Sequence, residues 1–428
     1  MKRFFLKILE FKLVFFAKRV LSRYQPKIVA VAGSVGKTST VQAIALALAK
    51  DFRVGQTLRS YNQELGVPLS ILRQETGYRS LWRWLKIFLR AAGLAFGRKK
   101  SDFPQVLVLE LGADKPGDLE RLLNWVKPEI GVLTSATVEH VEFFGSIEAA
   151  IAEEQKLVKS LPKNAVAVLN ADDPNVVAAT PQIRAKIIRY SQNQSAEVQV
   201  NNAAILGENV KNLQGVSAKI SVSGSSIPVV IQDTVGRHSL YAVAAAFAVA
   251  HALQVNLSNV SEQLRKYQPP AGRMRLLKGV KDTLIIDDTY NSSPAAAKAA
   301  LDTLAELETP AKKYAILGDM RELGPVSEEE HVKIGQYVLG KADYLITVGE
   351  QAKHIANGAK FAGFPIDRIL SFDKPEGVGN FLQDRLLAQD LILVKGSQGI
   401  RCEKVVKEIM AEPERASELL TRQYWPWI

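Results

Sequence analysis

A glycine-rich loop between an apolar strand and a helix constrains this chain more than any other feature of its sequence. The apolar run 28–32 leads into Gly33-Ser34-Val35-Gly36-Lys37-Thr38-Ser39, and residues 38–50 have the Ala- and Leu-rich periodicity of a helix. Glycines let backbone N–H groups approach phosphate oxygens, and the amino end of a helix adds partial positive charge. In such a loop Lys37 neutralises the β- and γ-phosphates, and the Thr38 hydroxyl ligates Mg²⁺. The order of strand, loop and helix therefore favours nucleotide binding over a chance Gly-Lys-Thr at a helix cap.

Runs that predict buried strands alternate with helical patterns in two successive stretches of the chain. A turn cluster at 269–272 separates the stretches and marks the expected domain boundary. Such alternation predicts a parallel sheet with helices on both faces. We therefore expect an α/β protein with a phosphate-loop, parallel-sheet ATPase domain at 28–270, carrying a small β insertion at 197–235, and a Rossmann-like α/β domain at 271–428. The expected strands are 28–32, 106–109, 130–133, 165–169, 283–286, 314–317, 344–348 and 391–394, and a helix is expected at 240–253.

Basic residues are concentrated in two short segments. Residues 1–27 and 78–100 each carry a formal charge of +7, whereas the whole 428-residue chain carries +11, so the remainder is slightly acidic. The first segment is expected to form a basic amphipathic helix, and the second lies in a basic amphipathic insertion at 72–104. The basic side chains that fall along one side of a helix in this insertion are Arg79, Arg83, Lys86 and Arg90.

The two basic segments predict helices that lie on an anionic membrane surface. Leu, Trp and Phe fill the rest of the second segment, which is typical of lipid-facing helices. Neither segment has the roughly 20 apolar residues needed to span a bilayer, and their aromatic content argues against nucleic acid as the partner. The alternatives are that the two helices pack on each other or on the body of the protein, or that they dimerise.

A series of motifs beyond the loop resembles those of the Mur ligases, the amide-bond-forming enzymes of peptidoglycan synthesis. The resemblance runs in order through about residues 28–410 and is greatest to the members that add D-alanyl-D-alanine. It implies an ADP-forming acid–amino-acid ligase that phosphorylates a carboxylate and captures the acyl phosphate with an amine. It also implies ATP and Mg²⁺ as cofactors, and a muramyl-peptide-like acceptor and D-Ala-D-Ala as small-molecule partners. The matching segments are 33–39, 57–68, 109–112, 140–146, 236–238, 272–273, 287–294, 317–324 and 395–397, together with His331.

The resemblance assigns catalytic and metal-binding roles around the phosphate loop. Glu110 ends a predicted strand, at the edge where open α/β sheets bind ligands. A carboxylate there, beside the Thr38 hydroxyl, offers the oxygen ligands that Mg²⁺ prefers. The resemblance further implies that Lys37 is catalytic and that His140 holds a second Mg²⁺.

A further metal ligand of the family is a carbamylated lysine on the helix after a Gly-Ser pair. Counted from Gly145-Ser146, the expected position falls on Glu154 or Gln155, one or two residues before Lys156. One helix position is a rotation of about 100°. Either a shifted register brings Lys156 to the metal, which is our prediction, or Glu154 binds the metal directly.

The remaining expected contacts come mainly from the second domain. An arginine beside the domain boundary is suited to clamp the phosphates or ribose as the domains close. The resemblance implies that the end of the last strand meets the carboxylate of the incoming dipeptide, and that an acidic loop meets its ammonium group. The expected nucleotide contacts are Arg273, Asp288 and Asn291. The expected substrate contacts are Asn62, Asp319, Glu322, Lys395 and Ser397.

The sequence departs from the family at its beginning. Only about 27 residues precede the phosphate-binding strand, so we expect the chain to lack the domain with which Mur ligases bind the UDP-sugar end of the acceptor. Two alternatives stay open: a Mur-like ligase with another acceptor, lipid-linked or similar to that of folylpolyglutamate synthetases, and a non-catalytic nucleotide-binding scaffold at the membrane. The single cysteine, Cys402, excludes a disulfide framework and fits a cytoplasmic protein.

Overall fold

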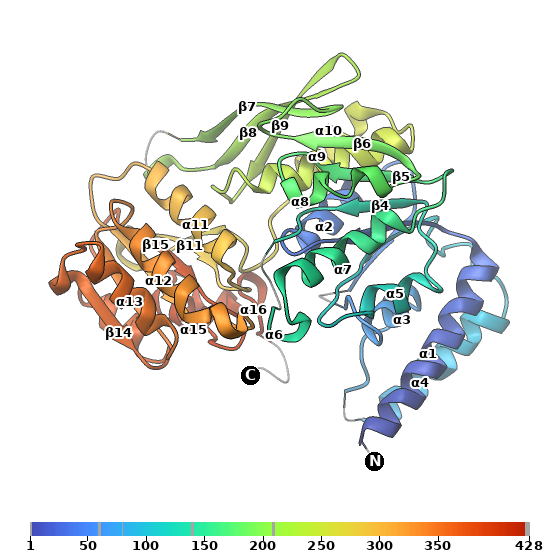
Figure 1. The fold of residues 1–428 in the computed structure, drawn as a ribbon, viewed down its shortest axis with the longest axis horizontal. Helices are drawn as coiled ribbons and strands as arrows, with labels where there is room; N and C mark the ends of the chain where they lie inside the picture. The colour runs from blue at the N-terminus through green and yellow to red at the C-terminus, as the bar shows by residue number, and fades with distance from the viewer. Residues whose placement is uncertain (1, 59–60, 79, 138–140, 208–209, 424–428) are drawn as a thin grey trace.

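The computed structural model describes residues 2–58, 61–78, 80–137, 141–207 and 210–423. Within these ranges the chain forms two β-sheets, each covered by helices on both faces (Figure 1). The α/β fold with two parallel-sheet units is therefore confirmed. The predicted boundary at residues 270 and 271 falls between the last helix that packs on the first sheet and the first strand of the second.

The first sheet has nine strands in the order β2-β3-β1-β4-β5-β6-β7-β8-β9. From β2 to the β6–β7 pair the strands are parallel, whereas β7, β8 and β9 pair antiparallel. The predicted β insertion at 197–235 is thus an antiparallel extension of the same sheet. The strands are β1 Lys27–Ala32, β2 Val54–Gln56, β3 Val106–Glu110, β4 Ile130–Leu133, β5 Val166–Asn170, β6 Lys186–Ser191, β7 Val198–Leu206, β8 Gly215–Val222 and β9 Ser225–Gln232.

Two hydrophobic cores sandwich this sheet, because its central strands are apolar on both faces. One face packs against α2 (Lys37–Leu48), α9 (Ser239–Ala252) and α10 (Leu257–Leu264). The other face packs against helices that include α3 (Gly66–Ile71), α5 (Asp118–Leu123) and α7 (Ile147–Lys159). The short helices α6 (Val141–Phe144) and α8 (Pro174–Val177) follow β4 and β5.

The second sheet has six strands in the order β10-β11-β15-β12-β13-β14. All neighbours are parallel except β10 and β11. One face packs against α11 (Pro294–Glu306), α12 (Ser327–Val338) and α13 (Ala352–Phe361), and the other against α14 (Val378–Gln383), α15 (Glu403–Ile409) and α16 (Ala416–Leu419). The strands are β10 Arg275–Lys278, β11 Leu284–Asp288, β12 Lys313–Gly318, β13 Tyr344–Val348, β14 Ile369–Phe372 and β15 Leu391–Lys395.

Helices α1 (Lys2–Tyr24) and α4 (Leu81–Phe96) lie side by side and form an arm that projects from the first sheet (Figure 1). Leu13 and Ala17 of α1 and Ile87 and Ala91 of α4 are among the side chains buried along this pair. The two predicted helices therefore pack on each other, which was one of the alternatives to membrane binding. Arg79, the first residue of the expected basic stripe, lies outside the described residues. Across the described part of the chain, no helix is both long and apolar enough to cross a bilayer.

Candidate active site

The phosphate loop takes its shape from two glycines and from the end of β4. Gly33 and Gly36 have φ of +130° and +86°, the region that favours glycine. A side chain at Gly33 would meet the Thr134 hydroxyl, because its Cβ would lie 2.3 Å from that oxygen. The Ser135 hydroxyl accepts a hydrogen bond from the Val35 N–H at 2.8 Å. The loop is thus clamped against the strand that neighbours β1, ahead of the first turn of α2.

A hydroxyl, a carboxylate and a guanidinium meet behind the loop. The Thr38 hydroxyl donates to Glu110 Oε2 at 2.9 Å and accepts from Arg273 Nη2 at 3.0 Å. Asn62 Nδ2 donates to the other oxygen of Glu110 at 2.9 Å. Glu110 ends β3 and is only 2% exposed. The structure therefore brings together four of the predicted site residues, three before and one after the predicted domain boundary.

This group of side chains fits both a nucleotide phosphate and Mg²⁺. Arg273 Nε is buried and has no hydrogen-bond partner among the described residues, which leaves a donor for an incoming anion. The Thr38 hydroxyl and the Glu110 carboxylate are hard oxygen ligands of the kind that Mg²⁺ binds. Lys37 Nζ donates to the Gly33 carbonyl and, at 3.2 Å, to that of Ser34, so its ammonium group lies over the loop. His140, the predicted second magnesium ligand, lies outside the described residues.

Helix α7 directs Glu154 toward the loop and Lys156 away from it. Glu154 Oε2 accepts a hydrogen bond from the Gly33 N–H at 2.8 Å. Lys156 Nζ instead pairs with Glu153 at 2.8 Å and with Glu120 at 3.4 Å. The hydrogen bond to Glu153 raises the pKa of Lys156, which disfavours the neutral amine that carbamylation requires. Of the two residues that the sequence left open, the structure places Glu154 at the loop and Lys156 away from it.

The segment after β11 is tied to β15 by a buried ion pair. Lys395 is 2% exposed, and its Nζ lies 2.6 Å from Asp288 Oδ2 and donates to the Asn291 carbonyl at 2.9 Å. The Ser397 hydroxyl donates to the Ser292 carbonyl at 3.2 Å. These contacts join the end of β15 to the segment that follows β11. They fix the backbone of that segment in this structure.

The two predicted ammonium-binding acids are placed differently. Asp319 is buried, its Oδ1 accepts from the Ala352 N–H at 2.7 Å at the start of α13, and burial raises its pKa. Glu322 is exposed with φ of +66°, and its carbonyl accepts from the Glu142 N–H of α6 at 3.3 Å. Asp319 thus anchors a helix of the second sheet, whereas the loop with Glu322 contacts the first domain.

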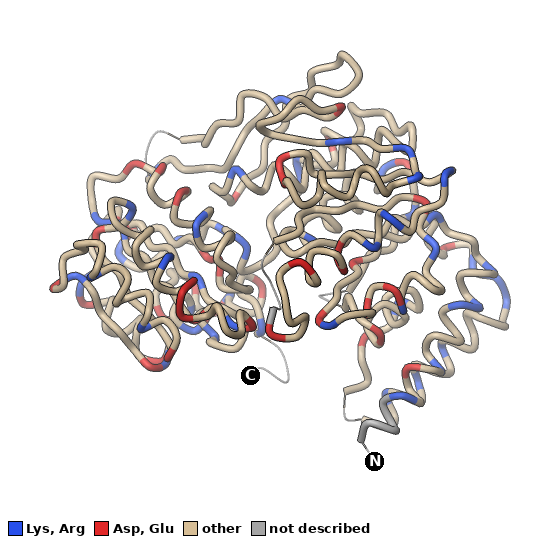
Figure 2. The backbone as a smooth tube through the Cα atoms, viewed as in Figure 1, with Lys and Arg blue, Asp and Glu red and all other residues tan. Residues whose placement is uncertain are grey.

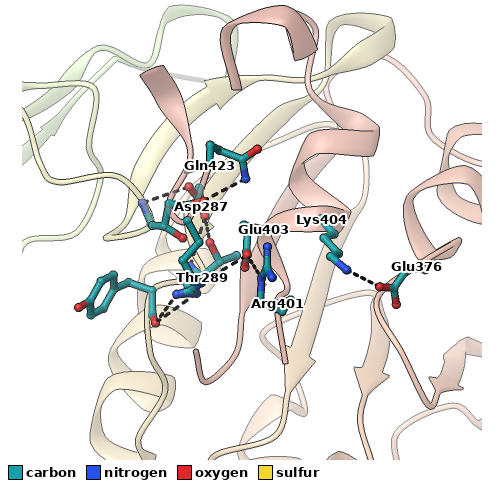
Figure 3. A network of polar contacts seen from close by, with 11 residues as sticks. Asp287, Thr289, Glu376, Arg401, Glu403, Lys404 and Gln423 are labelled. Atoms are coloured by element: carbon teal, nitrogen blue, oxygen red, sulfur yellow. Dashed lines mark hydrogen bonds and ion pairs between the residues drawn. The ribbon is translucent and has the colours of Figure 1, made fainter. Parts of the chain in front are cut away.

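Residues near the end of the chain support the site although no motif marked them. Arg422 is 4% exposed and donates to the carbonyls of Thr289 and, at 3.2 Å, Tyr290. It also lies 3.3 Å from Glu403. Figure 3 shows Asp287 and Thr289 beside Glu403 in this network. Nothing in the sequence pointed to Arg422, because the burial of its side chain appears only once the fold is known.

A buried carboxylate holds the turn that carries Arg273. Asp287 Oδ2 accepts from the Gly272 N–H at 3.1 Å, and Oδ1 accepts from the Thr289 N–H at 3.2 Å. Burial raises the pKa of Asp287 to about 6. The Arg273 guanidinium then stacks over the Tyr290 ring, 4.2 Å from its centroid. This packing aims Arg273 at Thr38.

Comparisons with known proteins agree on one family. Residues 94–250 match the family model described as the Mur ligase middle domain, and residues 272–398 match that of the Mur ligase, glutamate ligase domain. The UDP-N-acetylmuramoyl-tripeptide–D-alanyl-D-alanine ligase of Bacillus subtilis is 25% identical over 399 residues, 93% of this chain and 79% of the relative. That of Escherichia coli is 25% identical over 90% of this chain and 76% of the relative. The MurF ligase of Thermotoga maritima, solved in complex with ADP, has a TM-score of 0.77 at 25% identity, covering 95% of this chain and 84% of that one.

Proposed function

The chain belongs to the Mur ligase family, and we propose that it is an ATP-dependent ligase that joins D-Ala-D-Ala to a muramyl peptide in peptidoglycan precursor synthesis. The observation that carries the proposal is the contact of Arg273 with Thr38, 3.0 Å between Nη2 and Oγ1, because it joins the second domain to the phosphate loop of the first. Thr38 and Glu110 would hold Mg²⁺, which supplies charge neutralisation to the phosphates.

The residues of this chain suit an acyl-phosphate mechanism. An oxygen of the acceptor carboxylate attacks the γ-phosphorus, and the bond from that phosphorus to ADP breaks. Lys37 and Arg273 stabilise the charge on the phosphoryl oxygens. The amine of the dipeptide, having lost a proton, then attacks the acyl carbon, and phosphate leaves with the former carboxylate oxygen. Closure of the two domains over the site would keep water from hydrolysing the acyl phosphate.

A phosphate-release assay with the full chain tests this proposal. The acceptors are UDP-linked and lipid-linked muramyl tripeptides, each offered with ATP, Mg²⁺ and either D-Ala-D-Ala or L-glutamate. We expect release that requires D-Ala-D-Ala. Release with L-glutamate and an added folate acceptor, but with neither muramyl tripeptide, would instead indicate a folylpolyglutamate-synthetase-like ligase. Absence of release with every pair would indicate a nucleotide-binding scaffold.

We also propose that the α1–α4 arm binds the anionic inner face of the cytoplasmic membrane, where the ligase works. Trp82 and Leu89 of α4 are 74% and 65% exposed. The Phe15 and Phe96 rings lie 6.4 Å apart, so the exposed apolar surfaces of the two helices are continuous. Figure 2 shows Lys and Arg along both helices of the arm. An apolar surface flanked by cations suits a lipid headgroup region. The exposed large apolar side chains of the arm are Ile8, Phe11, Phe15, Leu81, Trp82, Leu85, Leu89 and Phe96.

Co-sedimentation with vesicles tests the arm. We expect the chain to bind phosphatidylglycerol-containing vesicles more tightly than pure phosphatidylcholine vesicles, and less tightly as salt rises. The double variant Trp82→Ser/Leu89→Ser should lower the partition coefficient at least about tenfold. Phe361→Ser is the control, because Phe361 is 85% exposed on α13 of the other domain. Equal partition of the double variant and the unaltered chain would rule out this surface.

A further inference from the structure

A single acidic side chain of α7 is aimed at the phosphate loop. Glu154 is 7% exposed and its carboxylate accepts from the Gly33 N–H at 2.8 Å. Its neighbours point elsewhere: Glu153 accepts from the Leu119 N–H at 3.0 Å, and Gln155 Nε2 donates to the Asn175 carbonyl at 2.6 Å. The helix register therefore places one buried carboxylate at a loop whose N–H groups are suited to anions.

A carboxylate in this position opposes phosphate unless a cation lies between them. Two anions in a weakly solvated site repel each other strongly, and a carboxylate that faces phosphate oxygens is a common way of holding Mg²⁺. Both oxygens of Glu110 already accept hydrogen bonds, from Thr38 and Asn62. Glu154 is thus a second carboxylate on the same loop, reaching it from a different helix.

We propose that Glu154 is a cation-positioning residue that makes nucleotide binding depend on Mg²⁺. The inference rests on the proposed function, because it requires a nucleotide at the loop. The carboxylate is encoded in the sequence, so the site needs no carboxylate made by reaction of a lysine with carbon dioxide. Lys156, held by Glu153 and Glu120, takes no part in it.

A bracing role for Glu154 predicts a different result from a cation-positioning role. Glu154→Gln keeps an oxygen that can accept from the Gly33 N–H and removes only the charge. If Glu154 merely braces the loop, this variant should bind ADP as the unaltered chain does, with and without Mg²⁺. If Glu154 positions a cation, metal-free ADP should bind more tightly to the variant, and the gain from adding Mg²⁺ should shrink.

Isothermal titration calorimetry of ADP, in excess EDTA or in excess Mg²⁺, distinguishes the bracing role of Glu154 from the cation-positioning role. The EDTA removes divalent ions from the protein and the buffer. We expect Mg²⁺ to tighten ADP binding to the unaltered chain at least about tenfold, and this factor to fall at least about fivefold in Glu154→Gln. Glu154→Asp, which keeps the charge, should retain most of the dependence. An identical Mg²⁺ factor in the unaltered chain and Glu154→Gln would overturn the proposal.

Lys156→Arg is the matched variant on the same helix. Arginine keeps a cation for Glu153 and Glu120 but cannot be carbamylated. We expect its Mg²⁺ factor to equal that of the unaltered chain, with or without bicarbonate in the buffer. If Lys156→Arg lost the tightening of ADP binding by Mg²⁺, or if this tightening depended on bicarbonate, the cation-positioning residue would be Lys156. Failure of the unaltered chain to bind ADP under every condition would instead count against the proposed function itself.

Discussion

The two halves of the candidate site use their charged residues in different ways. In the first domain, Glu110 and Lys37 surround a loop whose shape already suits phosphate, and they meet polar groups of that loop. In the second domain, Lys395 and Asp288 neutralise each other in a buried pair. Arg273 lies between the two, with Nη2 on Thr38 and a buried Nε without a partner in the described structure. From this comparison we propose that charges of the first half act on the ligand, whereas those of the second half fix the backbone that carries Arg273.

The largest expected effect is the loss of turnover in Lys37→Ala. Removing the ammonium group from the loop should lower kcat by about 10³-fold or more, because it stabilises charge on the transferred phosphoryl group. The melting temperature should change little, since the side chain is only partly buried. Lys50→Ala, just beyond the end of the same helix and paired with Glu262 at the surface, should leave turnover unchanged. Substantial turnover in Lys37→Ala would show that Lys37 does not stabilise the transferred phosphoryl group.

Lys395→Met should act mainly on stability, whereas Lys37→Ala acts mainly on turnover. It leaves Asp288 without its partner, and breaking a buried ion pair costs about 3–5 kcal/mol. The free energy of unfolding, measured by urea denaturation, reports this loss. The double variant Lys395→Met/Asp288→Asn should recover much of it, because it removes both charges. If Lys395→Met were as stable as the unaltered chain but inactive, Lys395 would belong with the ligand-binding residues.

Arg273→Ala should reduce kcat/KM by about 10²-fold, less than Lys37→Ala, because the guanidinium assists a loop that is already formed. Arg273→Lys should restore only part of the activity, since an ammonium group lacks the planar fork. Arg265→Ala, at an exposed position after α10, controls for the loss of one positive charge. Steady-state kinetics at saturating D-Ala-D-Ala measure the three variants. Full activity of Arg273→Ala would show that the contact between Arg273 and Thr38 is not needed for the reaction.

The smallest expected effect concerns pH and Asp287. Its pKa, raised by burial to about 6 from 3.8, means that ionisation disfavours the folded state. The penalty is absent below about pH 4, grows as pH rises to about 6, and amounts to at most about 3 kcal/mol above that. The stability of Asp287→Asn relative to the unaltered chain should therefore increase from pH 4 to pH 7. A constant difference in the free energy of unfolding across this range would show that Asp287 titrates normally.

The sequence predicted those parts of the site that follow from the local order of strands, loops and helices. The loop 33–39 and Glu110 were predicted because strand, loop and helix follow directly, and because strand ends of parallel sheets meet at one edge. The pair of Lys395 and Asp288 was missed although both residues were singled out. They are 107 positions apart and become opposite partners only when β11 and β15 pair.

Other parts depend on orientation or on packing and could not be read from the sequence. Glu154 and Lys156 differ by two helix positions, about 200° of rotation, so a motif count could not decide which one faces the loop. Arg422 belongs to no motif and acquires a role only through the burial of its side chain. The pairing of α1 with α4 joins two helices that are far apart in the sequence. Neither segment alone showed whether its apolar residues would contact the other helix or lipid.

An isotope-transfer experiment tests the central claim most directly. The acceptor peptide is prepared with ¹⁸O in the carboxylate that forms the amide, and the phosphate released on reaction with ATP and D-Ala-D-Ala is analysed by mass spectrometry. The acyl-phosphate mechanism predicts that each released phosphate carries one oxygen from that carboxylate. Amide formation with unlabelled phosphate, or ATP hydrolysis without amide, would contradict the account.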